Sequence, residues 1–317
     1  MTTAAFRRAA ASIAVLALIL AACGGDPDPD VTPTEEGVDA TEEATQATEP
    51  EDTEEAATEE GGEAAGVDGC SPDELETFEP GTLTVATGDP VFPPWMLDDD
   101  PEGGEGFENG LIYALAEELG YGEADVAWVR TGFDEAIAPG PKEYDFNIQQ
   151  FSVTEEREEV VDFSIVYYQP DKAVIALPDS VIAGAASFDD LREANWGASI
   201  GTTDLDYLEN ILGVSDVAVF DDQAGVFQAL EGGQIDATVA ALPTALFATA
   251  VQVPDAAIVA VLPPDPNDNG HGLLFEDGSP LVDCIDQGLQ ALIDDGVVDD
   301  LAEQYLTGDG EIPAITG

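Results

Sequence analysis

The stretch FSVTEEREEVVDFSIVYY, residues 151–168, contains an arginine that follows two hydroxyl side chains at close spacing. Ser152 and Thr154 precede Arg157, so that two hydroxyls and a guanidinium can converge on one anion. A guanidinium presents a rigid fork of N–H donors that matches a carboxylate. The alternative is a capped helix start whose arginine forms an ordinary salt bridge. Spacing alone leaves both interpretations open.

Positive charge is scarce in this chain, which makes each cation informative. Residues 69–317 contain 51 Asp and Glu against five Lys and Arg, a formal net charge of −46. Four of the five cations, Arg130, Lys142, Lys172 and Arg192, are interpreted as surface residues. So acidic a chain is an implausible partner for nucleic acid. Its self-repulsion predicts a salt-adapted, halophilic protein. The alternative is that the acidity reflects genomic bias alone.

The N-terminus carries the features of an export signal. Arg7 and Arg8 precede an apolar run, residues 9–22, that is too short to be interpreted as a spanning helix. The segment LAAC, residues 20–23, resembles the lipobox of bacterial lipoproteins. That resemblance implies a diacylglyceryl group on Cys23 and an extracytoplasmic chain held on the outer face of a membrane. The alternative is a plain signal peptide with an incidental cysteine.

The chain changes composition sharply after Cys23. Residues 24–68 are rich in Thr, Glu, Ala, Asp, Pro and Gly, without Lys, Arg or aromatic residues. Such a segment cannot bury enough apolar surface to fold, so it is predicted to be a disordered acidic linker. The remaining 249 residues suit one large domain or two coupled lobes. Cys70 and Cys284, near the two ends of that part, are predicted to form a disulfide because exported proteins usually pair their cysteines.

Alternating strand and helix patterns predict an α/β fold with largely parallel sheets. One clear helix has Leu111, Leu115 and Leu119 at a spacing of four, followed by Gly120. The predicted strands are residues 83–86, 126–129, 146–148, 172–177, 197–200, 218–220, 237–240 and 273–275. Further helices are predicted around residues 133–138, 205–212 and 226–230, and from Leu281 and Val298 onward.

Three segments in this order, residues 151–168, GTT at 201–203 and GQIDA at 233–237, resemble family 3 of the bacterial extracellular solute-binding proteins. The resemblance covers about residues 82–306. It implies a two-lobed periplasmic-binding-protein fold of type II, with two crossovers and a ligand cleft between the lobes. The expected division is residues 1–23 as signal peptide, 24–68 as linker, 69–170 with 271–317 as lobe 1, and 171–270 as lobe 2. The crossovers are expected near residues 169–172 and 262–271.

The resemblance also implies a function and a set of ligand-binding residues. It implies a monomeric substrate-binding lipoprotein that delivers a small carboxylate-bearing solute, an amino acid above all, to the permease of an ABC importer. No cofactor, metal or catalytic residue is implied. Arg157 would pair with the ligand carboxylate, and Thr154 would be a turn or cap residue. The other residues implied to contact the ligand are Phe92, Phe133, Ser152, Thr202 and Thr203. Gln149 and Gln150 follow the third predicted strand, where one of the pair must face the cleft by alternation, and Gln150 is preferred. Ordinary core packing is the alternative for Phe92 and Phe133.

One position departs from the family pattern. Family members commonly place an aspartate after the Asp-Ala pair to receive the ligand α-ammonium, and this chain has Ala241 there. Losing that acceptor would cost a buried ammonium about 1.5–3 kcal/mol. Either another carboxylate replaces it or the ligand is not an ordinary α-amino acid. Asp89 and Asp204 are the candidate replacements, and a cap or turn role is the alternative for each.

Two other functions remain open at this point. Related two-lobed proteins include periplasmic dehydratases of prephenate or arogenate, although the single histidine, His271, is expected to be structural. A solute sensor without a transport role is the second alternative. The ligand itself is not predicted.

Overall fold

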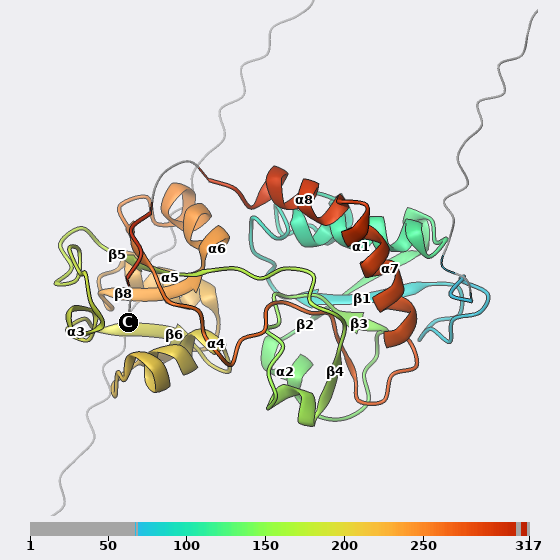
Figure 1. Cartoon of the computed structure of the whole chain (residues 1–317), viewed down its shortest axis with the longest axis horizontal. Helices are drawn as coiled ribbons and strands as arrows, with labels where there is room; N and C mark the ends of the chain where they lie inside the picture. Colours follow the sequence, from blue (N-terminus) through green and yellow to red (C-terminus); the bar gives the residue numbers. More distant parts are fainter. Residues whose placement is uncertain (1–66, 68, 309–311, 316–317) are drawn as a thin grey trace, which may run out of the picture. The chain divides into compact units, whose positions relative to one another are not determined.

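The computed structural model describes residues 67, 69–308 and 312–315. The predicted signal peptide, the predicted lipidation site Cys23 and, apart from Val67, the predicted linker lie outside the described residues. The described part contains two mixed five-stranded sheets, each with its own helices (Figure 1). Among the residues that the structure describes, no helix is long and apolar enough to cross a membrane.

The first sheet has the strand order β2-β1-β3-β10-β4, in which β1 is parallel to β2 and β3, and β10 is antiparallel to β3 and β4. Its strands are β1 Leu83–Gly88, β2 Val126–Thr131, β3 Phe146–Asn147, β4 Val161–Phe163 and β10 Leu274–Glu276. The helices of this lobe are α1 Phe107–Glu118, α2 Phe133–Ile137, α7 Val282–Asp294 and α8 Val297–Tyr305, with 3-10 turns at Pro101–Gly103, Glu123–Asp125 and Arg157–Glu159. The late strand β10 therefore completes a sheet begun by the N-terminal strands.

The second sheet has the order β7-β6-β8-β5-β9, with β6 parallel to β7 and β8, and β5 antiparallel to β8 and β9. Its strands are β5 Lys172–Ala176, β6 Trp196–Ser199, β7 Ala218–Phe220, β8 Ala237–Ala241 and β9 Ala257–Val261. Its helices are α3 Phe188–Leu191, α4 Thr203–Asp206, α5 Gln223–Glu231 and α6 Leu242–Phe247, with π-helical turns at Tyr207–Leu212 and Ala248–Gln252.

Helix α1 shows how the sequence builds the first lobe. Its spaced leucines, among them Leu111 and Leu115, are fully buried and pack with residues of α7 in one core. A side chain at Gly288 of α7 would lie 2.7 Å from Leu115, so glycine permits the two helices to approach closely. Gly120, with φ of +84°, follows the helix and supplies the left-handed stop that the pattern predicted.

Within residues 69–308, two crossovers join the two sheets, one after β4 and one after β9, and these crossovers lie side by side. His271 forms isolated β-bridges with Tyr168 and with Ser152, so the return segment pairs with the outgoing one. The indole of Trp95 packs against both crossovers, at 5.8 Å from the Tyr168 ring and 5.2 Å from the His271 ring between centroids. His271 is buried, as expected of a structural residue, and burial lowers its pKa to about 3.

The two-lobed α/β fold with two crossovers is confirmed, whereas the lobe boundaries by residue number stay a prediction. The described C-terminal residues 312–315 differ from the predicted division, which assigned residues 271–317 to lobe 1. Ala314 forms a parallel bridge with Val261 of β9, and Ile315 is buried in the core of the second sheet. At the other end, Cys70 forms the predicted disulfide with Cys284 of α7, across 214 residues of chain.

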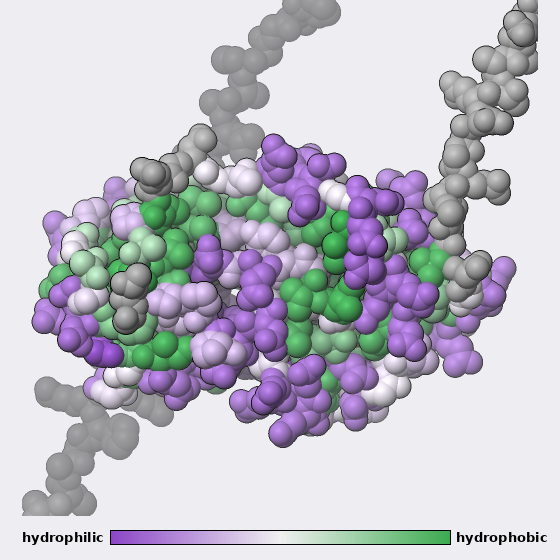
Figure 2. Space-filling view, viewed as in Figure 1, coloured by the Kyte–Doolittle hydropathy of each residue, from purple (hydrophilic) through white to green (hydrophobic). Residues whose placement is uncertain are grey.

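Hydrophilic side chains cover much of the face shown in Figure 2, between smaller apolar patches. Among the described residues only four ion-pair contacts occur, and two of them belong to one lysine, Lys172. The other two are Arg130 with Asp99 and Arg192 with Asp189. Most carboxylates of this part of the chain therefore have no cation beside them, as the scarcity of Lys and Arg requires.

Candidate functional site

A cavity of about 250 Å³ lies between the two lobes. Its wall combines residues of the first lobe, such as Phe133, residues of the second lobe, such as Thr238, and residues of the return crossover, such as Asp268. All nine residues predicted to contact a ligand line it: Asp89, Phe92, Phe133, Gln150, Ser152, Arg157, Thr202, Thr203 and Asp204. The fold therefore brings together predicted residues that are up to 115 positions apart in the sequence, from Asp89 to Asp204.

Arg157 begins a 3-10 turn, Arg157–Glu159, and the residue is 7% exposed. Nη1 donates to the Ser152 carbonyl at 2.6 Å, and Nη2 donates across the cleft to the Gly201 carbonyl at 2.9 Å. The Thr154 hydroxyl accepts from the Arg157 backbone N–H, in agreement with the predicted turn or cap role. Within the described chain no carboxylate oxygen lies within salt-bridge distance of this guanidinium. The salt-bridged alternative for Arg157 is therefore not the one that the structure adopts.

Phe133 packs beside the guanidinium. Its ring stacks on Phe151 at 4.8 Å between centroids, and the Arg157 Cζ lies 5.4 Å from the Phe133 centroid. That distance is within the range of a cation–π contact. Burial lowers the pKa of Arg157 from its ordinary value, but a guanidinium remains charged at neutral pH. The Phe133 ring stabilises the guanidinium charge, and the charge remains available to an anion.

Lys172, the first residue of β5, forms a cluster with two aspartates at the same cavity wall. Its Nζ lies 2.8 Å from Asp204 Oδ1 and 3.1 Å from Asp268 Oδ2, and it donates to the Thr203 hydroxyl at 2.9 Å. Burial disfavours the ammonium, but the attraction of Asp204 and Asp268 outweighs it and raises the pKa of Lys172 to about 12. Burial likewise opposes the charge of Asp268, yet Lys172 and several hydrogen bonds lower its pKa to about 2. Lys172 is therefore not the surface cation that the sequence suggested.

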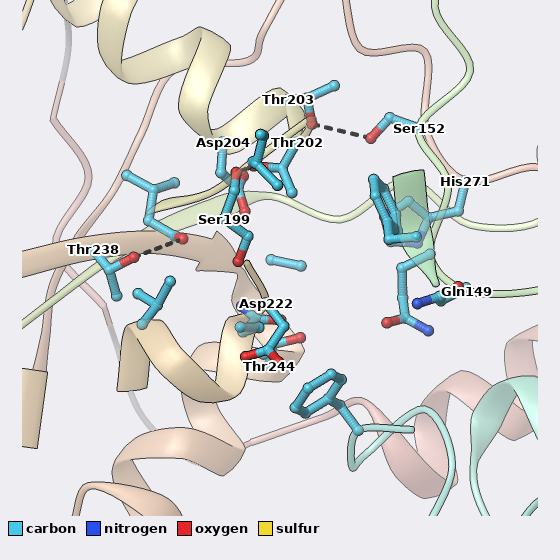
Figure 3. Close-up of a pocket in the computed structure, with 18 of the residues that line it drawn as sticks. Gln149, Ser152, Ser199, Thr202, Thr203, Asp204, Asp222, Thr238, Thr244 and His271 are labelled. Carbon is cyan, nitrogen blue, oxygen red and sulfur yellow. Dashed lines mark hydrogen bonds between the residues drawn. The ribbon is translucent and has the colours of Figure 1, made fainter. Parts of the chain in front are cut away.

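The same aspartate binds two hydroxyls that were predicted to face the ligand. Ser152 Oγ donates to Asp268 Oδ2 at 2.9 Å, and Thr203 Oγ1 donates to the same oxygen at 3.0 Å. Ser152 and Thr203, which come from opposite lobes, also lie 3.2 Å apart between their hydroxyl oxygens (Figure 3). The Thr202 hydroxyl accepts from Leu205 and so caps α4. These three hydroxyls already have protein partners.

Asp204 was one of two candidate acceptors for a ligand ammonium. Its carboxylate instead forms an ion pair with Lys172. Asp89, the other candidate, is exposed at the cavity and forms no ion pair among the described residues. Asp222 also lines the cavity, where its carboxylate caps α5 by accepting from the Gly225 N–H at 2.7 Å. Ala241 faces Lys172 directly in the β5–β8 ladder. A carboxylate at position 241 would therefore lie beside a lysine.

Gln150 follows β3 and lines the cavity with a left-handed backbone, at φ of +51°. Its backbone N–H donates to Glu108 Oε1 at 2.9 Å, and its side-chain Nε2 donates to Glu108 Oε2. Glu108 lies in the first turn of α1 and is fully buried, and Tyr167 donates its hydroxyl to the same carboxylate at 2.5 Å. The preference for Gln150 over Gln149 rested on strand alternation, but both residues line the cavity.

Sequence reasoning missed Lys172, Asp268 and Glu108 as parts of the site. Lys172 and Asp268 are 96 positions apart and meet only because the two crossovers run side by side. Lys172 ends the first predicted crossover and Asp268 lies within the second, which was the available signal. Glu108 had no such signal, because an acidic residue in the first turn of a helix is common on the surface.

The comparisons with known proteins agree with this geometry. The family model of bacterial extracellular solute-binding proteins, family 3, matches residues 83–308. The L-cystine-binding protein TcyJ of Escherichia coli K12 is 32% identical over 162 residues, which is 50% of this chain and 58% of that protein. The chain thus spans less than two thirds of that relative's length.

Solved structures give a similar result over a larger share of the chain. An ancestral arginine-binding protein bound to arginine is 28% identical, with a TM-score of 0.59, over 71% of this chain and 98% of that one. The ancestral amino acid-binding protein AncCDT-1, a precursor of cyclohexadienyl dehydratase, is 27% identical, with a TM-score of 0.60, over 71% of this chain and 95% of that one. Because the family model covers well over half of the sequence, this chain belongs to family 3 of the bacterial extracellular solute-binding proteins.

Proposed function

We propose that this chain is the substrate-binding lipoprotein of an ABC importer, and that its two lobes close on a carboxylate-bearing solute, an amino acid. The observation that carries the proposal is the state of Arg157. Its guanidinium is buried at the wall of the cavity between the lobes, and two backbone carbonyls are its hydrogen-bond acceptors. An arginine so placed has donors left for an anion, and a carboxylate fits their planar fork.

The charge of the cavity narrows the class of amino acid. Five aspartates line it, Asp89, Asp204, Asp221, Asp222 and Asp268, against one arginine and one lysine. Like charges brought together in a partly buried site repel each other. We therefore infer that zwitterionic and cationic amino acids bind in preference to dicarboxylic ones. Asp89 is the proposed acceptor for a cationic group of the ligand, since Asp204 is paired with Lys172.

Differential scanning fluorimetry against the common amino acids and L-cystine tests the ligand class. A ligand at about 100 Kd adds about 2.7 kcal/mol to the stability of the folded state. Calorimetry on Arg157→Ala then tests the residue, with Arg130→Ala as a matched control because Arg130 pairs with Asp99 and does not line the cavity. Undiminished binding by Arg157→Ala would contradict the assignment of Arg157.

The export route and the importer are the remaining parts of the proposal. The lipobox-like segment supports a lipid on Cys23, which mass spectrometry of the chain from native membranes tests. Genes for a permease and an ATPase beside the gene for this chain would favour transport over sensing. AncCDT-1 is a precursor of cyclohexadienyl dehydratase, which keeps an enzyme on this scaffold as the second candidate. Turnover of prephenate or arogenate by the purified chain would favour that candidate.

A further inference from the structure

Glu108 is a buried carboxylate beside the cavity, and the binding scheme above does not use it. It is 0% exposed and accepts hydrogen bonds from the Gln150 backbone, the Gln150 side chain and the Tyr167 hydroxyl. Within the described residues no cation pairs with it. Two of its three donors belong to one residue, Gln150, which lines the ligand cavity.

An ionised carboxylate fixes the direction of the Gln150 amide. A carboxylate only accepts hydrogen bonds, so it attracts the NH₂ end of an amide and repels the carbonyl end. With Nε2 bound to Glu108, the Oε1 atom is at the other end of the Gln150 amide, and no hydrogen bond to it occurs among the described residues. The left-handed backbone of Gln150, tied to Glu108 through its N–H, holds the same orientation.

We propose that Glu108 is a positioning and specificity-determining residue that acts through Gln150, by presenting the carbonyl oxygen of that amide to a cationic group of the ligand. This inference rests on the proposed function, in which the ligand is an amino acid. The Gln150 amide oxygen then supplies a neutral acceptor in a site where Ala241 replaces the family aspartate and Asp204 is bound to Lys172. The ligand class follows from the chemistry, because an amide oxygen accepts from an ammonium or guanidinium and rejects a second carboxylate.

The charge of Glu108 changes within the neutral range. Burial raises the pKa of Glu108 to about 7, although the hydrogen bonds from Tyr167 and Gln150 oppose that rise. Tyr167 is the titratable group that faces it, and burial raises the Tyr167 pKa well above its ordinary value, so this phenol stays neutral. His271 stays neutral too because its pKa is about 3. A protonated Glu108 can donate to the amide oxygen, which allows the Gln150 amide to turn its NH₂ end to the cavity.

A double-mutant cycle on the full chain tests the inference. Calorimetry is performed with each panel amino acid that binds the wild-type protein, beginning with L-arginine and L-cystine, on Glu108→Gln, Gln150→Ala and the double variant. Glu108→Gln is expected to weaken binding about tenfold. In the Gln150→Ala background the same change is expected to alter affinity less than about twofold, because its effect passes through the amide.

The matched control is Asp145→Asn. Asp145 is also a buried carboxylate of the first lobe that accepts two backbone N–H groups, from Phe78 and Thr84, but it does not line the cavity. Its replacement is expected to lower the melting temperature and leave affinity unchanged. Wild-type affinity is expected to rise from about pH 6 to about pH 8 as Glu108 ionises, and the affinity of Glu108→Gln is expected to stay flat.

The possible failures are distinguishable. The role of Glu108 would be overturned if Glu108→Gln lowered affinity equally in the wild-type and Gln150→Ala backgrounds. It would also be overturned if wild type and Glu108→Gln showed the same dependence of affinity on pH. In both cases the amino-acid ligand would stand. If no amino acid in the panel binds the wild-type chain, the proposed function fails and this inference fails with it. If Glu108→Gln does not fold, Tyr167→Phe removes one donor to the same carboxylate and must shift the pH midpoint of binding.

Discussion

Arg157 and Lys172 are buried cations that line the same cavity, and they differ in what surrounds their charge. Lys172 lies between two aspartates, at 2.8 Å and 3.1 Å, and its side chain is 10% exposed. Arg157 is similarly buried, but the acceptors that hold it are the backbone carbonyls of Ser152 and Gly201. The lysine charge is matched by the protein, whereas no described carboxylate matches the arginine charge.

Because of this difference, we assign Lys172 to the stability of the fold and Arg157 to ligand binding. Burying an ion costs several kcal/mol unless a partner of opposite charge offsets it. Lys172 has that offset in the folded chain, so its cluster joins the two crossovers to the second lobe. We infer that Arg157 acquires its partner only from the ligand. Mutations at the two cations should therefore have different consequences.

The largest expected effect is that of Lys172→Met on stability. Asp204 and Asp268 would remain partly buried near each other without a cation, which typically destabilises a protein by about 3–5 kcal/mol. Denaturant unfolding measures this change. Lys142→Met is the matched control, since Lys142 donates to the backbone carbonyls of Ala136 and Ala138 and forms no ion pair in the described chain. If both variants unfold at the same denaturant concentration, the lysine cluster does not stabilise the fold.

Acid should weaken the lysine cluster by a somewhat smaller amount. The folded pKa of Asp268 is about 2, below its ordinary value of 3.8, so its contribution is fully present above about pH 4 and is lost as the pH falls toward 2. The expected loss is on the order of 2 kcal/mol. Unfolding of wild type and Asp268→Asn across this range measures it. The difference in stability between the two proteins should shrink as acid is added, and a constant difference would contradict the account.

Arg157→Lys should separate charge from geometry. A lysine keeps the positive charge but loses the planar fork, so affinity for a carboxylate ligand is expected to fall about tenfold. Stability without ligand should change little, because the ammonium can still donate to the same carbonyls. Calorimetry and a thermal melt on one preparation measure both quantities. A large loss of stability with normal affinity would reverse the roles assigned to the two cations.

Much of the fold was predictable because it depends on local patterns. The strand at Ala218–Phe220 was predicted at its observed bounds, and α1 followed from its leucine spacing. Strands β4 and β9 and helices α3 and α6 were missed. All four are shorter than seven residues, which is too short for a clear periodic pattern. Helix α6 also carries a proline near its start.

The sequence predicted nine of the residues that line the cavity, but it did not predict the hydrogen bonds and ion pairs between those residues. All nine candidates line it, because the resemblance fixes which loops face the cleft. The partners of Ser152, Thr203 and Asp204 were not predicted, since Asp268 and Lys172 reach them only through the paired crossovers. One sequence alone does not show which distant segments pair with each other in the fold. Gln150 was predicted to face the ligand, but its anchor Glu108 lies 42 positions away.

The smallest expected effect concerns salt. The chain is strongly acidic and has few ion pairs in its described part, so added salt should screen its repulsion and raise the melting temperature between 0.05 M and 2 M NaCl. The buried lysine cluster is screened much less, so the stability deficit of Lys172→Met should be similar at both concentrations. An unchanged or lower wild-type melting temperature at high salt would rule out salt adaptation.

The central claim is that the Arg157 charge is left for the carboxylate of the ligand. Calorimetry with the tightest-binding amino acid and with its carboxamide, on wild type and on Arg157→Met, tests it most directly. The account predicts that replacing the carboxylate weakens binding to wild type by about 100-fold and to Arg157→Met by less than about threefold. An equal loss in the two proteins would show that the ligand carboxylate binds elsewhere and would contradict the account.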